Sequence, residues 1–210
     1  MNNKLRIFFV GASFCIQSFL AANSSAATIS TTGDITLISP PPDVSLNVLE
    51  SDTEMWVFDE VQGLLLTADL SVNFGGTGGV ISAGTEINSH FVHKDTLGGT
   101  VTLSGTAIFD GTILGIIASP GNLDSSDSLL GLSGTTYPFG LDRRGTQIGE
   151  VGDSITFAGN TLTLTSATSS RPDQLRVITA VSTVPVPAAV WLFGSGLLGL
   201  VGMARRKRSA

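Results

Sequence analysis

Two histidines, His90 and His93 in the string HFVH, have a spacing that could bind a metal ion. On a helix, positions three residues apart share a face, so both imidazoles could reach one zinc ion. The neighbouring residues predict a strand instead, and on a strand odd and even positions point to opposite faces. We therefore interpret the pair as unrelated histidines on a half-exposed strand and assign no metal site to them.

The acidic string DSSD, from Asp124 to Asp127 with Asn122 nearby, offers the oxygen ligands that calcium prefers. It lacks the regular Asp spacing and the glycine of an EF-hand loop. Asp at the start of a helix also stabilises that helix through the exposed N–H groups and the helix dipole. We favour helix capping and keep Asp124 and Asp127 as weak calcium candidates, with no other cofactor indicated.

Hydrolytic chemistry would need an activated serine or two carboxylates in one cleft. The chain has no G-x-S-x-G string, and the nearest one, GLSGT at 131–135, has glycine directly after the serine. Trp56 or Tyr137 could stack on a sugar ring, although large aromatic residues more often lie in a core. Two glutamates could meet in space, but no spacing singles out a pair, and we name no catalytic residue. The glutamates are Glu50, Glu54, Glu60, Glu86 and Glu150.

Short strands must position these residues, because segments rich in Val, Ile, Thr and Phe alternate with Gly, Asn and Asp. Residues 100–109 alternate most clearly, with apolar side chains on one face. Residues 156–164 predict a hairpin that turns at Gly159-Asn160. The predicted strands are 35–39, 54–60, 64–74, 87–94, 100–109, 112–118, 154–157, 161–165 and 175–181.

A single short helix interrupts the strands in SSDSLLGL, residues 125–132, where Gly131 is a stop signal. Many short strands with frequent turns predict an all-β fold. We expect a β-sandwich, jelly-roll-like, with one short helix, plus an N-terminal signal helix and a C-terminal transmembrane helix. The domains are then a signal peptide at 1–27, an exported β-sandwich domain at 28–183 and a tail at 184–210.

The charge of residues 28–183 restricts what the exported domain can bind. Seventeen acidic residues against five basic ones leave a formal charge of −12. Nucleic-acid binding needs Lys and Arg to neutralise phosphates, so we exclude it. Repulsion also opposes docking on anionic lipid or polysaccharide unless a divalent cation mediates. Cys15, the one cysteine, lies within the signal, so the processed chain would have no disulfide or thiolate site.

Both ends of the chain carry membrane signals. Lys4 and Arg6, an apolar run and a small-residue site predict a signal peptide cleaved after Ala27. Residues 188–204 contain no charge and predict a short membrane-spanning helix. A basic end would anchor that helix on the cytoplasmic side: Arg205, Arg206, Lys207 and Arg208.

The tail VPVPAAVWLFGSGLLGLVGMARRKR, residues 184–208, resembles the PEP-CTERM sorting signal of Gram-negative bacteria. The resemblance implies recognition by an exosortase, a membrane transpeptidase that would cut near Pro185-Val186-Pro187. It also implies a link to exopolysaccharide and biofilm matrix. Val186 departs from the glutamate of the name-giving pattern. Strings such as FDGTILGIIAS and DQLRVITA are similar to uncharacterised exported domains with this tail and imply no activity.

These observations predict an exported protein, held transiently in the inner membrane and then moved to the cell surface or the extracellular matrix. We expect a non-catalytic role, with neutral glycans or other matrix proteins as partners. Two alternatives stay open: a secreted hydrolase that acts on polysaccharide through paired carboxylates, and an envelope protein that stays anchored without processing.

Overall fold

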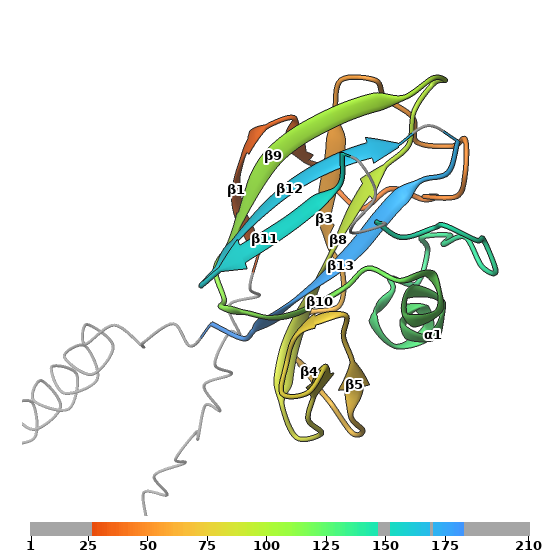
Figure 1. Ribbon diagram of the computed structural model, residues 1–210. Coiled ribbons are helices and arrows are strands. Elements are labelled where there is room, and N and C mark those ends of the chain that lie inside the picture. The colour runs from red at the N-terminus through yellow and green to blue at the C-terminus, as the bar shows by residue number, and fades with distance from the viewer. Residues whose placement is uncertain (1–26, 147–151, 169, 183–210) are drawn as a thin grey trace, which may run out of the picture.

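Antiparallel strands dominate the computed structural model, which describes residues 27–146, 152–168 and 170–182 (Figure 1). The predicted all-β class is confirmed. The predicted signal peptide before Ala27 and the tail from Val184 lie outside the described residues, as do the membrane helix at 188–204 and the basic end. Among the residues described, no helix has the length and apolarity that crossing a membrane requires.

A four-stranded sheet forms one layer of the molecule, with its strands in the order β1-β9-β12-β11. The predicted alternation in β9 is confirmed: Leu103, Ala107 and Phe109 are buried, whereas Thr102 and Ser104 are exposed. Side chains of a strand alternate between faces, so one face of this sheet is apolar and the other is rich in Thr and Ser. The strands are β1 (Thr28–Gly33), β9 (Val101–Phe109), β12 (Thr161–Thr168) and β11 (Ser154–Ala158).

A larger sheet faces the first one and has the strand order β2-β3-β8-β13-β10-β6, with β4 also paired to β8. Its two long central strands, β8 and β13, are buried along almost their whole length. The strands are β2 (Ile35–Leu37), β3 (Met55–Asp59), β4 (Leu64–Leu65), β6 (Phe74–Gly75), β8 (Glu86–Lys94), β10 (Ile113–Ile117) and β13 (Asp173–Ala180).

The burial of β8 and β13 follows from two cores on the two faces of this sheet. Val92 packs in the first core, which the two sheets share and which includes Phe109 from β9. Phe91, the next residue to Val92, packs in the second core with Leu123 of helix α1 (Pro120–Leu130). Because β8 is covered on both faces, His90 and His93 have no exposed surface, so the expected half-exposed strand there is wrong.

Strand pairing between the sheets is nested. Strand β8 pairs with β13 in the larger sheet, and the next strand, β9, pairs with β12 in the four-stranded sheet. Each step from β8 to β9 and from β12 to β13 therefore crosses from one sheet to the other. Strand β10 pairs with the other edge of β13, and β11 pairs with the other edge of β12.

The predicted hairpin at 156–164 is confirmed as β11 and β12, with Ala158 opposite Thr161. Gly159 has a φ of +58°, which L side chains adopt with strain. The Asn160 side chain donates a hydrogen bond to the carbonyl of Phe109, 2.6 Å away. Backbone hydrogen bonds from Phe109 N–H to the Asn160 carbonyl and from Ile113 N–H to the Gly159 carbonyl also hold the turn.

Residues 64–74 were predicted as one strand, and this is wrong. The chain forms three two-residue strands there, β4, β5 (Leu70–Ser71) and β6, and β5 pairs with β7 (Val80–Ile81) instead of joining either large sheet. Leu66, Leu70 and Val72 all pack in the second core, so the chain must turn repeatedly to bury them. Strands β1 and β7 were not predicted.

The helix begins earlier than predicted, at Pro120 instead of Ser125. Proline fits the first helical turn because its missing N–H is unpaired there in any case. Gly131 is the C-cap, and its N–H donates to the carbonyl of Asp127, so the predicted stop at this glycine is confirmed.

Candidate functional site

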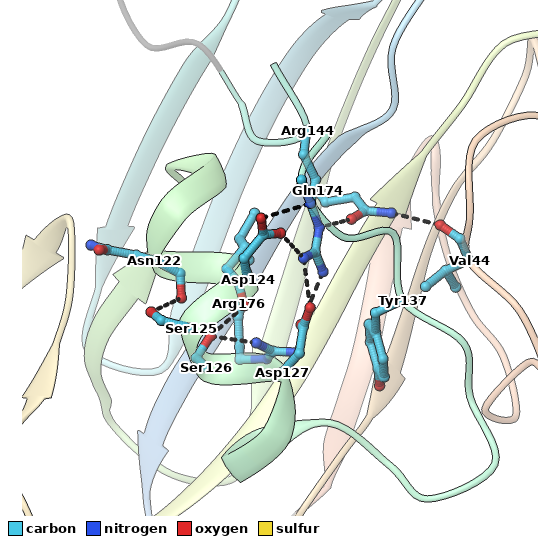
Figure 2. A network of polar contacts seen from close by, with 12 residues as sticks. Val44, Asn122, Asp124, Ser125, Ser126, Asp127, Tyr137, Arg144, Gln174 and Arg176 are labelled. Atoms are coloured by element: carbon cyan, nitrogen blue, oxygen red, sulfur yellow. Dashed lines mark hydrogen bonds and ion pairs between the residues drawn. The ribbon is translucent and has the colours of Figure 1, made fainter. Parts of the chain in front are cut away.

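Two arginines with no exposed surface, Arg144 and Arg176, lie between α1 and the larger sheet (Figure 2). They are the centre of a group of polar side chains that we call the arginine cluster. The members come from α1, from the loop after it and from the sheet: Glu60, Asp124, Ser126, Asp127, Tyr137, Arg144, Gln174 and Arg176.

Arg176 on β13 makes a two-point ion pair with the buried carboxylate of Glu60. Its Nε donates to Glu60 Oε2 at 2.5 Å, and its Nη2 donates to Glu60 Oε1 at 2.8 Å. Nη1 donates to Ser126 Oγ at 2.6 Å, and Nη2 reaches Asp127 Oδ1 at 3.2 Å. The guanidinium carbon also lies 5.1 Å from the ring centre of Phe91, within cation–π range.

Arg144 joins the loop after α1 to the helix itself and to β13. Its Nη1 donates to Asp124 Oδ1 at 2.7 Å and to Asp127 Oδ2 at 2.6 Å, and its Nη2 donates to Asp127 Oδ1 at 3.0 Å. Its Nε donates to Gln174 Oε1 at 2.7 Å. Gln174 Nε2 in turn donates to the carbonyl of Val44 at 2.8 Å (Figure 2).

Burial and charge act in opposite directions on Arg176. Burial alone would lower the pKa of its guanidinium, but the Glu60 carboxylate and then Asp127 outweigh burial and hold this pKa above its ordinary value. Burial, then the neighbouring Glu60 charge, raise the pKa of the Tyr137 hydroxyl, which donates to Glu60 Oε1 at 2.7 Å. Arg176 is therefore a permanent cation, and Tyr137 stays neutral at physiological pH.

The predicted capping role of Asp124 and Asp127 is wrong. Both lie inside α1 rather than in its first turn, and Ser119 is the N-cap, without a side-chain hydrogen bond. Asp residues here bind the Arg144 guanidinium, which fastens the helix to the loop. The two calcium candidates therefore present carboxylates that a buried cation already engages.

Of the glutamates that the structure describes, Glu60 is the buried one. Glu60 is 4% exposed, and Arg176 pairs with both Glu60 and Asp127. The carboxylate of Glu60 therefore already accepts hydrogen bonds from the guanidinium. Glu54 is exposed and accepts a hydrogen bond from Thr36 Oγ1 at 3.0 Å. Glu86 is exposed at the start of β8, and Glu150 lies outside the described residues. Around Glu60 the arrangement stabilises charge and leaves no carboxylate free to transfer a proton.

His90 and His93 face opposite sides of β8, as their strand positions predict. His90 Nδ1 lies 2.7 Å from Asp59 Oδ1, and its ring packs on Phe109 at 4.5 Å. Burial favours a raised pKa for Asp59, but hydrogen bonds from His90 and Thr28 outweigh it and lower this pKa. Thr28 donates to Asp59 Oδ1 through both its backbone N–H, at 3.0 Å, and its hydroxyl, at 2.7 Å.

His93 lies on the other face, where its Nε2 is 2.9 Å from the carbonyl of Leu49 and its Nδ1 is 2.8 Å from Gln174 Nε2. Burial lowers its pKa to about 4, against weaker opposite effects of Leu49 and Asp95. Trp56 stacks on the His93 ring with centres 6.1 Å apart and is itself buried. Trp56 is thus part of the packed interior, and Tyr137 is half-buried with its ring against Phe91, 5.3 Å between centres.

A cavity of about 330 Å³ opens where α1 begins. Its lining is Asn73, Phe74, Ala118, Ser119, Pro120, Arg143, Gly145 and Thr146. Thr146 is 6% exposed, and its hydroxyl has no hydrogen-bond partner. Asn73 Oδ1 accepts from the N–H groups of Ala118 and Ser119, at 2.8 and 2.9 Å. A second, smaller cavity of about 160 Å³ lies on the outer face of the four-stranded sheet beside Thr156 and Thr163.

Neither the arginine cluster nor the cavity at the start of α1 was predicted from the sequence. The sequence contains one signal for the cluster: Arg176 stands between two apolar residues, Leu175 and Val177, in a predicted strand, which indicates a buried, paired charge. No local pattern marks Thr146. Within the described ranges, no group of three or more His, Cys, Asp or Glu residues is placed to hold a metal ion.

Comparisons with known proteins find no counterpart: the chain matches no protein-family model, no curated protein and no solved structure.

Proposed function

We propose that the chain is an exported cell-surface or extracellular-matrix protein with a non-catalytic binding or structural role. The observation that carries the proposal is the tail at 184–208, in which a P-x-P string, a charge-free run and a basic end follow one another. An exosortase-type enzyme would cut near Pro185–Pro187 and free the domain from a transient inner-membrane anchor. A link to exopolysaccharide and biofilm matrix comes with the resemblance of this tail.

Several features of the described domain support a binding or structural role. Glu60, Asp124 and Asp127 are each bound by buried arginines, which suits them to holding the fold together. A cysteine-free domain with two separate cores can fold in an exported compartment without disulfides. No observation in the described residues favours hydrolysis by paired glutamates, and we do not propose it.

We also propose that the two facing sheets form a jelly-roll-like β-sandwich. Nested pairing supports this classification, since β8–β13 encloses β9–β12 and each pair lies in a different sheet. At the edge of the larger sheet, strand β6 pairs antiparallel with β10.

The test is the fate of the tail in a Gram-negative host that encodes an exosortase. We expect intact-mass analysis of the medium to give a chain without the residues beyond the P-V-P string. The double variant Pro185→Ala/Pro187→Ala should remain in the membrane fraction with its tail, because the extended backbone just outside the membrane would be lost.

Pro40 and Pro42 provide a matched control, because they are exposed and have the same P-x-P spacing. The variant Pro40→Ala/Pro42→Ala should be released as the wild type is. Recovery of the wild-type chain only in membranes, with an intact tail, would reject sorting and support a permanently anchored envelope protein.

A further inference from the structure

We propose that residues 118–146 form a surface that binds a second copy of this chain, with Phe139 of each copy seated in the cavity at the start of α1 of the other. We call this surface, made of α1 and the loop after it, the helix–loop face. The inference goes beyond the proposed function, because self-association requires neither export nor cleavage. Two features of the face complement each other: an exposed aromatic ring and an apolar cavity.

Phe139 is the most exposed large apolar side chain in the described residues, with an exposed fraction of 84%. Its neighbours fix its position from both sides. The Tyr137 hydroxyl belongs to the arginine cluster, Pro138 is buried, and the Gly140 N–H donates to Asp124 Oδ2 at 2.9 Å. A ring that is already held in place binds without the cost of ordering a loop, and aromatic anchors carry much of the energy of an interface.

The cavity suits an apolar ring better than a polar ligand. Its walls at Phe74, Ala118 and Pro120 are apolar. The polar side chains beside them already have partners: Asn73 Nδ2 donates to Ser119 Oγ at 3.1 Å, and Asn73 Oδ1 accepts two backbone N–H groups. A cavity of about 150 Å³ can hold a benzene ring, so a volume of about 330 Å³ accommodates a phenyl group.

The loop after α1 carries both the ring and one wall of the cavity. It contacts α1 through the Gly140 N–H, and at Gly145 it lies so close to the Ala118 carbonyl that a side chain has no room there. Phe139 precedes Arg143 of the cavity wall by four residues, and its exposure shows that it does not fill the cavity of its own chain. A two-fold axis between two such faces brings each ring to the other cavity, which is the reciprocal contact of a symmetric dimer.

Charge also favours this face for contact between two acidic domains. Three acidic residues against two basic ones give residues 118–146 a formal charge of −1, whereas residues 28–183 carry −12. Arg144 binds two of the three carboxylates, and Arg171 pairs with the third. Like charges repel across an interface, so two copies meet with little repulsion where the charges are already balanced.

Sedimentation equilibrium of the full 210-residue chain in density-matched detergent micelles tests the contact. We expect a reversible dimer with a dissociation constant of about 10 μM. Phe139→Ala removes the exposed ring and should raise this constant by about tenfold or more. Ser119→Phe fills the cavity from within the same chain and should weaken the dimer in the same way.

An equal mixture of these two variants tests whether the ring and the cavity contact each other. Phe139→Ala keeps an open cavity and Ser119→Phe keeps the ring, so a mixed dimer regains one of the two contacts. The mixture should therefore contain more dimer than either variant alone. Absence of any gain on mixing would reject the reciprocal contact.

Leu97→Ala is the matched control, because Leu97 is 71% exposed and lies between β8 and β9, outside the helix–loop face. It should form dimers as the wild type does. A wild-type chain that stays monomeric, or a dimer that neither Phe139→Ala nor Ser119→Phe weakens, would reject this surface. Neither result affects the proposed cleavage of the tail, which intact mass tests separately.

Discussion

Most of the basic side chains in this domain are buried instead of exposed to solvent. Three of the five basic side chains in residues 28–183 are buried: Lys94, Arg144 and Arg176. Lys94 donates to the carbonyls of Val101 and Ser166, and burial lowers its pKa. Three acidic side chains, Glu60, Asp95 and Asp173, are buried as well, so burial leaves the net charge of the exposed groups near the formal −12.

Arg176→Met tests the buried pair with Glu60. It leaves the Glu60 carboxylate buried without its cation, so we expect the free energy of unfolding to fall by about 3–5 kcal/mol in urea denaturation. The double variant Arg176→Met/Glu60→Met should recover part of this loss, because no uncompensated charge then remains.

Arg171→Met is the control for that prediction. Arg171 pairs with Asp142 at 3.4 Å, and the two side chains are 40% and 79% exposed. Exposed ion pairs contribute about 0–1 kcal/mol, so this variant should unfold nearly as the wild type does. Equal losses for Arg171→Met and Arg176→Met would contradict the structural role of the cluster.

His93 should make stability depend on pH. Its pKa in the folded chain is about 4, mainly because of burial, against an ordinary 6.5 in the unfolded chain. Between these values the unfolded chain binds a proton that the folded chain does not. The free energy of unfolding should therefore fall as pH drops from 6.5 to 4, by up to about 1.4 kcal/mol per pH unit from this residue.

The measurement compares urea unfolding of the wild type and His93→Gln across this pH range. Other titrating groups act alike in both chains, so the difference in slope belongs to His93. Identical slopes would show that the imidazole is protonated in the folded state.

Residue roles were harder to predict than strands, because they depend on contacts between distant segments. Arg176 and Glu60 are 116 positions apart, and Arg144 meets Asp127 across a turn that the sequence does not specify. The opposite orientation of His90 and His93 needed only the strand period, and it was predicted.

Elements with a strong local pattern were predictable, and elements that depend on pairing were not. Strand β9 and the β11–β12 hairpin follow from alternation and from Gly159-Asn160. Strand β1, with the sequence TISTTG, has no apolar alternation and exists because β9 pairs with it. The break of residues 64–74 into three strands follows from the second core, which needs distant residues to form.

Gly159→Ala tests the hairpin turn. No atom lies within 4 Å of the added methyl group, so the effect comes from the φ of +58° alone. We expect a loss of about 1–2 kcal/mol in the free energy of unfolding.

Gly121→Ala is the matched substitution in α1, where the methyl group also meets nothing within 4 Å and φ is not positive. Here alanine favours the helix, and we expect a gain of about 0.4–1 kcal/mol. A loss of stability at both glycines would show that something other than backbone conformation decides the effect.

At the scale of the whole molecule, both ends of the described domain meet at one corner. The carbonyl of Ala27 accepts from the N–H of Asp110, and the N–H of Ala180 donates to the carbonyl of Thr112. Residues 110–112 thus join the start of β1 to the end of β13. The proposed cleavage after Ala27 falls at this corner, and the one near Pro185 comes after β13 in the sequence, so neither cut would interrupt a strand of the two cores.

The contact between Thr28 and Asp59 gives the first cut a chemical consequence. Cleavage after Ala27 would convert the backbone N–H of Thr28, 3.0 Å from Asp59 Oδ1, into a terminal ammonium group. This cation would meet a carboxylate that His90 also contacts. Its pKa should rise above the ordinary value of about 7.7, because the charged form gains a partner.

The stabilisation from that ammonium should be fully present below pH of about 7.7 and should be lost as pH rises through the raised value. Urea unfolding between neutral and alkaline pH should therefore show this loss for a chain that begins at Thr28. A chain that keeps Ala27 has its ammonium one residue away and should show less of it; equal behaviour would contradict the pairing. Asp59 would then make the stability of the domain depend on where the signal peptide is removed. A chain that begins at Thr28 would form the ion pair, and a chain cut elsewhere would be easier to unfold and degrade.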